Sequence, residues 1–127
     1  LGMTIAEISS NEPTLEGGKG AFERVRAAGV TAVVTYNDLM AIGLLREATA
    51  AGVKVPEDLS IIGFDNIFGS DFTNPPLSTI EMPLQKIGAE AVETLLKSFI
   101  AEDDEPMHGT TEVTSLLVRG STAKAKA

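Results

Sequence analysis

Cysteine is absent from this chain of 127 residues, and histidine occurs only once, as His108. Without cysteine, the chain can form neither a disulfide framework nor a thiolate metal site. His108 stands beside Gly109 in an expected surface loop, and one histidine with scattered carboxylates does not make a metal site. We therefore expect no bound metal and no cofactor.

Basic side chains are also scarce, with 10 lysines and arginines against 18 acidic residues and a formal charge of -8. Nucleic-acid binding depends on cationic side chains that displace counterions from phosphates, so this chain is not expected to contact DNA by itself. No apolar run approaches the roughly 20 residues that a membrane span needs. Residues 1–3 do not begin a signal peptide, which would need a basic start and a longer apolar stretch. The composition predicts a cytoplasmic protein with no membrane partner.

Catalytic motifs are missing as well. Residues 16–20 (EGGKG) resemble a phosphate-binding loop only in composition, because the first glycine at the required spacing and the Ser or Thr after the lysine are absent. Gly17 and Gly18 are better explained as positions that let two helices approach closely. No nucleophile with an attendant base is recognisable, so we do not expect an enzyme.

Apolar and turn patterns divide the chain into alternating strands and helices. The 3.6-residue pattern is strongest in the penultimate segment, which carries a wide apolar stripe. This alternation predicts a single α/β domain in which a parallel sheet carries helices on both faces. Strands are expected at residues 3–9, 31–36, 59–64, 77–81 and 110–119, helices at 15–28, 39–49 and 84–99, a charged turn at 102–105 and a frayed tail at 121–127.

Two predicted strands end in polar pairs, Asn37 with Asp38 and Asp65 with Asn66, and a third connection lies at residues 11–14. The carboxyl ends of parallel strands share one edge of the sheet, where open α/β sheets bind ligands. A carboxylate accepts hydrogen bonds, whereas an amide both donates and accepts, which suits a sugar, polyol or nucleoside. Asn and Asp also cap helices and shape turns. We assign Asp38 to a helix cap, and Asn37 and Asp65 to the ligand.

Six strings occur in the order typical of one family: PTLEGG at residues 13–18, NDLMAIG at 37–43, VPEDLSIIGFDN at 55–66, PLSTI at 76–80, GAEA at 88–91 and LVRGST at 117–122. Together they resemble the effector-binding domain of the LacI/GalR family of bacterial transcription regulators. The resemblance implies a periplasmic-binding-protein-like fold of type I, of which this chain would be a C-terminal lobe fragment. Residues 1–82 would form the lobe, 83–104 a helix that crosses to the N-terminal lobe, and 105–127 the returning strand with a tail.

The same resemblance implies a function. The chain would be the effector-sensing and dimerising portion of a transcriptional regulator, controlled by a small polar molecule. DNA would be contacted only through a helix-turn-helix domain for which this chain has no counterpart. A lobe of a periplasmic sugar-binding protein that serves a transporter is the alternative, since it shares the fold and the polar residues at the strand ends.

Carried over by position, the family pattern gives Asn37 and Asp65 to the effector. Pro13 falls where relatives often stack an aromatic ring, and Met82 falls where many sugar-binding relatives have a glutamine. Both departures weaken a simple sugar assignment. Met82 offers only a soft apolar surface, so the ligand would be less polar there.

The family's homodimer interface falls, by position, on the helix and loop that contain Leu39, Ile42, Phe68 and Phe72. Core packing is the alternative for the two phenylalanines, because buried positions favour such side chains. The apolar stripe of the helix at 84–99 would lack its N-terminal-lobe partner in this chain. We therefore expect the chain to self-associate or to place that helix differently.

Overall fold

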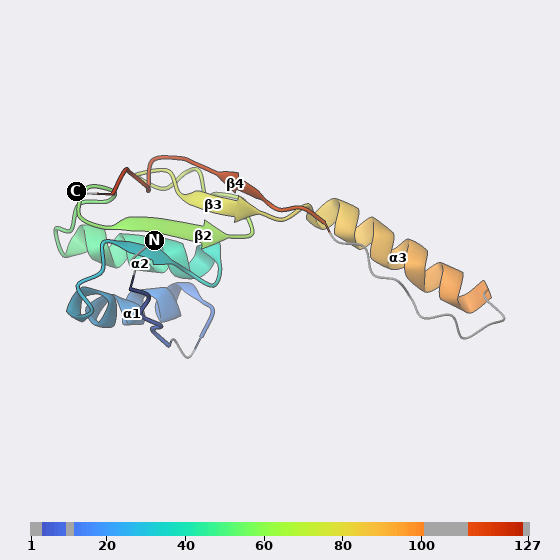
Figure 1. Cartoon of the computed structure of the whole chain (residues 1–127), viewed down its shortest axis with the longest axis horizontal. Helices are drawn as coiled ribbons and strands as arrows, with labels where there is room; N and C mark the ends of the chain where they lie inside the picture. The colour runs from blue at the N-terminus through green and yellow to red at the C-terminus, as the bar shows by residue number, and fades with distance from the viewer. Residues whose placement is uncertain (1–3, 10–11, 101–111, 126–127) are drawn as a thin grey trace.

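A four-stranded sheet organises the structure, a computed structural model that describes residues 4–9, 12–100 and 112–125 (Figure 1). The strands lie side by side in the order β1-β2-β3-β4. Along the chain, the elements are α1 (Leu15–Ala27), β1 (Ala32–Val34), α2 (Asp38–Ala50), β2 (Ser60–Phe64), β3 (Ser78–Glu81), α3 (Leu84–Ile100) and β4 (Ser115–Leu117). His108 and the predicted turn at 102–105 lie outside the described residues.

Three of the four strands run parallel. β1 pairs with β2 and β2 with β3 in the parallel sense, whereas β4 runs antiparallel to β3. The register sets Val34 opposite Ile62 and Phe64 opposite Ile80. The predicted α/β fold class with a mainly parallel sheet is confirmed, and β1, β2 and β3 end at one common edge.

The first two helices begin and end within one residue of the predicted positions. The Oγ1 of Thr14 accepts a hydrogen bond from the backbone N–H of Gly17 at 3.1 Å and so caps the start of α1. Gly29 and Gly52 follow the helix ends with φ of 62° and 77°. Glycine adopts these positive angles at little steric cost, which lets the chain leave a helix abruptly.

Helices α1 and α2 pack against each other at two glycines. A Cβ added to Gly18 of α1 would overlap the carbonyl oxygen of Met40, and one added to Gly43 of α2 would overlap the carbonyl oxygen of Leu15. The two backbones therefore approach too closely for any larger residue at these positions. The expected packing role is confirmed for Gly18.

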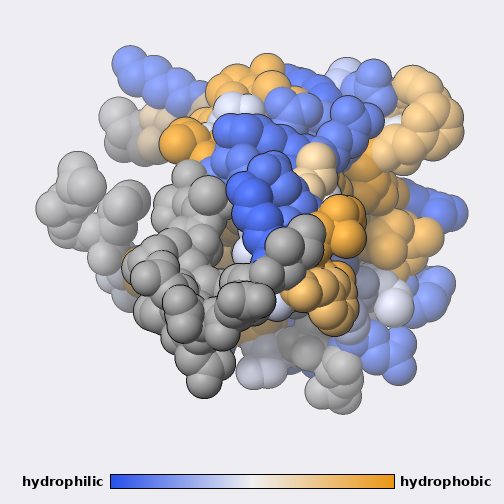
Figure 2. Space-filling model, turned by 90° about the vertical axis from the view of Figure 1, so that its right-hand side faces the viewer, coloured by the Kyte–Doolittle hydropathy of each residue, from blue (hydrophilic) through white to orange (hydrophobic). Residues whose placement is uncertain are grey.

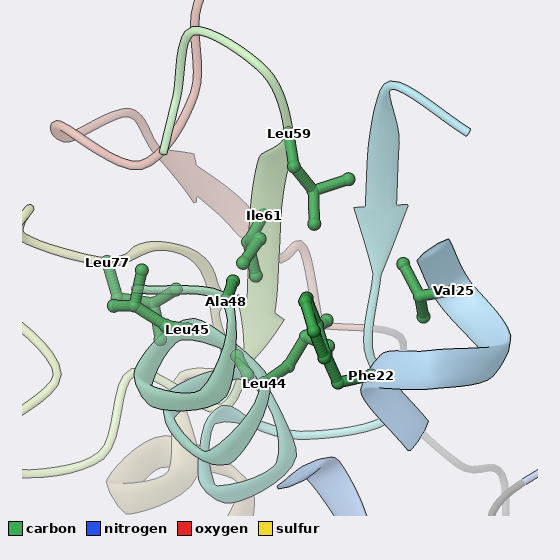
Figure 3. Close-up of a cluster of buried hydrophobic side chains, with 9 residues drawn as sticks. Phe22, Val25, Leu44, Leu45, Ala48, Leu59, Ile61 and Leu77 are labelled. Carbon is green, nitrogen blue, oxygen red and sulfur yellow. The ribbon is translucent and has the colours of Figure 1, made fainter. Parts of the chain in front are cut away.

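The hydrophobic core lies between β2 and the two helices (Figure 3). Phe22 and Val25 come from α1, Leu44 from α2 and Ile61 from β2, and each is no more than 4% exposed. Full burial of such a side chain contributes about 1.5–3 kcal/mol. Because one cluster joins both helices to the sheet, α1 and α2 cover the same face; helices were expected on both. Helix α2 connects the parallel strands β1 and β2, and α1 packs against α2, so both helices lie on one side of the sheet.

Two expectations at the ends of the chain are wrong. Residues 4–9 contain no strand, because a hollow separates them from β1, the nearest edge of the sheet, and a strand needs a hydrogen-bonded neighbour. The tail is not frayed at Ser121, which is fully buried. The Oγ of Ser121 donates to the carbonyl oxygen of Ile61 at 2.6 Å and accepts from the N–H of Ser78 at 2.7 Å. This hydroxyl fastens the segment after β4 to two strands.

Helix α3 leaves the body of the molecule between β3 and β4 (Figure 1). Five of its large apolar side chains are each more than half exposed, whereas Ile87 is half-buried. In Figure 2, which views the molecule from the α3 end, hydrophobic surface lies beside a hydrophilic strip. Among the described helices, none combines the length and apolarity needed to span a lipid bilayer. The exposed side chains are Leu84, Val92, Leu95, Leu96 and Phe99.

Candidate functional site

The candidate site is the edge of the sheet at which β1, β2 and β3 end. Asn37 follows β1, Asp65 follows β2 directly, and Met82 follows β3 directly. Backbone hydrogen bonds extend the pairing past the strands: Thr35 N–H donates to Ile62 O at 2.9 Å, and Asp65 N–H donates to Ile80 O at 2.9 Å. The parallel register therefore brings three of the predicted site residues to the same edge.

Asn37 joins this edge to the start of α1. Its side-chain oxygen accepts from Met40 N–H at 2.9 Å, and its Nδ2 donates to the carbonyl oxygen of Pro13 at 2.9 Å. The fourth predicted residue, Pro13, thus lies against Asn37. The half-buried amide keeps one N–H and one oxygen lone pair for a ligand.

Asn37, and not Asp38, caps α2, so the predicted roles of these neighbours are wrong in that respect. A cap residue has extended backbone angles, and Asn37 has φ of -152° and ψ of 173°, whereas Asp38 is the first helical residue. Asp38 is fully buried. Its Oδ1 accepts from the Thr79 hydroxyl at 2.6 Å, and its Oδ2 accepts from the Ile67 N–H at 2.9 Å. Asp38 is a buried link between α2, β3 and the chain after β2.

Asp65 occupies a strained turn. Asp65 and Asn66 have φ of 100° and 52°, a left-handed conformation that side chains other than glycine rarely adopt. Two successive positions of this kind persist only where the surroundings hold them, and such strain gathers at functional sites. The half-buried Asp65 carboxylate makes no hydrogen bond with a described residue. It is therefore available as an acceptor at the sheet edge.

Pro13 and Met82 supply apolar surface at the same edge. Pro13 is exposed and Met82 is half-buried. The backbone of Met82 is held by a hydrogen bond from Leu84 N–H to its carbonyl oxygen at 2.8 Å. Neither side chain can donate a strong hydrogen bond, so among the four predicted site residues only Asn37 and Asp65 carry hydrogen-bonding side chains.

Tyr36 is a candidate that the sequence analysis missed. It is the only tyrosine of the chain, stands immediately before Asn37 and is 78% exposed. With Pro13 and Met40 it lines a hollow of about 1160 Å³ that extends along β1. Asn37, Asp65 and Met82 do not line this hollow. An aromatic residue that ends an apolar strand just before a polar pair was the signal for Tyr36.

The expected dimer residues differ in their surroundings. Phe68 is 92% and Phe72 is 71% exposed, which rules out core packing for both. Their rings contact each other edge to face, with centroids 5.3 Å apart. Leu39 is exposed at the start of α2, whereas Ile42 is half-buried and packs against the core.

Charged side chains pair at the base of α3. Lys86 Nζ lies 2.8 Å from Glu112 Oε1, which joins the helix to the chain before β4. The side-chain hydrogen bond from Lys86 lowers the pKa of Glu112, and the same bond raises the pKa of Lys86. Within the described ranges, no group of three or more His, Cys, Asp or Glu residues is placed to hold a metal ion.

A mainly parallel sheet with polar residues at its carboxyl edge is the arrangement in which open α/β folds bind ligands. The periplasmic binding protein-like domain family matches residues 3–122, and the chain belongs to this family. It corresponds to part of the effector-binding domain of LacI-family regulators.

Three known proteins illustrate the relationship. The transcriptional regulator MalR of Streptomyces coelicolor is 42% identical over 112 residues, which are 88% of this chain and 32% of MalR. A LacI-family regulator of Enterococcus faecalis, solved with bound ribose, is 36% identical with a TM-score of 0.80, over 91% of this chain and 43% of that one. The regulator CelR, in complex with cellobiose, is 32% identical with a TM-score of 0.84, over 94% of this chain and 38% of that one. The chain thus spans about a third of the length of MalR.

Proposed function

We propose that this chain is the effector-sensing and dimerising portion of a LacI-type transcriptional regulator that binds a sugar, polyol or nucleoside. The observation that carries the proposal is the free carboxylate of Asp65, held in a strained turn at the carboxyl edge of the sheet. The amide of Asn37 lies at the same edge, after the neighbouring strand β1. Sugars in two structural relatives, ribose and cellobiose, support a ligand rich in hydroxyl groups.

In this proposal, each side chain has a separate task. Asp65 accepts hydrogen bonds from ligand hydroxyls, and Asn37 uses its remaining N–H and lone pair for a second group. The exposed ring of Tyr36 stacks on the ligand in place of the aromatic residue that Pro13 replaces. Met82 covers an apolar part of the ligand. The site binds and does not catalyse.

DNA binding belongs to a part of the protein that this chain does not contain. Ligand closure over the edge would shift a two-state equilibrium, which changes the arrangement of the DNA-binding heads in a cytoplasmic homodimer. The exposed Phe68 and Phe72 pair and the exposed Leu39 form the proposed dimer contact, with Ile42 behind it.

Calorimetry on the full-length protein tests the effector site. Ribose, cellobiose, lactose, adenosine and cytidine are titrated into the wild type, Asp65→Ala and the control Asp71→Ala, which changes an exposed loop aspartate. We expect at least one ligand to bind, and Asp65→Ala to weaken it about 10- to 100-fold, as loss of a hydrogen bond to a charged group predicts. Equal affinity of wild type and Asp65→Ala would remove Asp65 from the site.

Two further variants separate stacking from hydrogen bonding. If the ring of Tyr36 stacks on the ligand, Tyr36→Phe retains the affinity and Tyr36→Ala loses about 5- to 10-fold, as one aromatic contact predicts.

For dimerisation, light scattering compares Phe68→Ser with Val113→Ser, which also changes an exposed apolar residue. A monomer in the first and a dimer in the second is the expected result.

A further inference from the structure

The carboxamide of Asn66 lies between two opposite charges. Arg119 Nη2 donates to its Oδ1 at 2.8 Å, and its Nδ2 donates to Glu81 Oε1 at 2.8 Å. The cation faces the amide oxygen and the carboxylate faces the amide nitrogen, so both hydrogen bonds are charge-assisted and favour the same orientation of the amide. We name these three residues the Asn66 clamp.

Both charged members of the clamp are themselves fixed. Arg119 Nη1 donates to Leu77 O at 2.8 Å and to Ser70 Oγ at 3.1 Å. Glu81 Oε2 accepts a longer hydrogen bond from Ser115 Oγ at 3.4 Å. The clamp thus has little freedom to follow a displaced Asn66.

The clamp also lies at the root of α3. Glu81 is the last residue of β3, from which the chain enters α3, and Ser115 is the first residue of β4, after the chain returns. Figure 1 shows both connections side by side where α3 leaves the body. Asn66 directly follows Asp65 within the strained turn. Asn66 therefore joins that turn to the end of β3, and Glu81 continues the link to the start of β4.

We infer that Asn66 is a positioning residue that holds the Asp65 carboxylate in place and couples its turn to the two connections of α3. This inference rests on the proposed function for the identity of Asp65 as the effector acceptor. A ligand that moves Asp65 pulls on Glu81 and, through it, on Ser115. The position of α3 then depends on whether a ligand occupies the site.

Hydrogen exchange on the full-length protein without ligand tests the clamp. Asn66→Asp keeps the shape and the acceptor for Arg119, but sets a carboxylate against Glu81. We expect exchange to rise about tenfold at residues 64–67 and 115–117, as loss of one charged hydrogen bond predicts. Glu81→Gln alone raises exchange by less than Asn66→Asp, about two- to fivefold, because its oxygen still accepts from Asn66 but no longer carries a charge.

The double variant Asn66→Asp with Glu81→Gln decides the inference. In it, the Gln amide donates to the new carboxylate, and exchange at both segments returns to within about twofold of the wild type. Asn74→Asp, the same change at an exposed asparagine, is the control. Unchanged exchange in Asn66→Asp, an equal rise in α1, or no recovery in the double variant would each overturn the clamp. Since no ligand is used, a failure of the calorimetric test of Asp65 would be separate from these outcomes.

Discussion

Replacement of Asp38 by alanine is predicted to be the most damaging single change near the site. The carboxylate is fully buried and accepts hydrogen bonds from Thr79 at 2.6 Å and Ile67 at 2.9 Å. A hydrogen bond to a charged group contributes about 1.5–3 kcal/mol, and Asp38→Ala removes two of them and leaves the Thr79 hydroxyl and the Ile67 N–H without their acceptor. We therefore expect Asp38→Ala to lower the free energy of unfolding by about 3–5 kcal/mol.

Asp38→Asn has a smaller predicted effect, because its oxygen can still accept one of the two hydrogen bonds. The amide nitrogen then faces either the N–H of Ile67, which is a second donor, or the hydroxyl of Thr79, which can turn to accept from it. A mismatched contact, or the loss of the charge from both hydrogen bonds, corresponds to a loss of about 1–3 kcal/mol. The free energy of unfolding should therefore increase from Asp38→Ala to Asp38→Asn to the wild type. This order distinguishes a hydrogen-bonded buried carboxylate from a side chain that only fills space.

Urea unfolding of the 127-residue chain, followed by far-ultraviolet circular dichroism because the chain has no tryptophan, measures both variants. With a slope of about 2 kcal/mol per molar, the midpoint of Asp38→Ala should fall by about 1.5–2.5 M. Asp71→Ala, at an exposed aspartate, should leave it unchanged. A loss below about 1 kcal/mol for Asp38→Ala would refute the argument from burial.

Three further predictions concern the helices. Gly18→Ala should destabilise the chain by about 1–3 kcal/mol because its Cβ overlaps α2. Gly20→Ala places its Cβ in open space and should stabilise the chain by about 0.5–1 kcal/mol. Equal urea midpoints for the two variants would contradict this prediction. Glu112 should titrate below its ordinary value of 4.5 and return toward it in Lys86→Gln, as followed by carboxyl NMR. Because the folded pKa is lowered, the contact stabilises above the ordinary value and is lost as the pH falls through the folded one. The exposed stripe of α3 should make the chain self-associate in light scattering, and Leu95→Glu should reduce that association; a monomer at every concentration would refute it.

The elements of the fold were predictable because they depend on short-range patterns. The helix around Phe22 and Val25 follows from apolar spacing, and Gly29 marks its end. The buried strand that contains Ile61 is read from a continuous apolar run. The order of strands and helices then fixes a parallel sheet, which sends Asn37 and Asp65 to the same edge.

The roles of neighbouring polar residues were not predictable in the same way. Asn37 and Asp38 are both good caps by residue type, and the prediction that Asp38 caps α2 was wrong. The choice depends on Thr79, which lies 41 positions away and is the partner that lets Asp38 be buried. A contact at that separation leaves no local signal in the sequence.

The sequence by itself determined the types of the elements from α1 to β4, the α/β class and the family, because periodicity, caps and glycine positions act over a few residues. It also predicts the edge at which a ligand would bind. The tertiary structure decided which side chains are buried, which are exposed and which are bonded. It placed Ser121 in the core, left Phe68 and Phe72 on the surface, and closed the Asn66 clamp with Arg119, 53 positions away. Burial of a polar group requires a partner at hydrogen-bond distance, and only the folded chain determines where that partner lies.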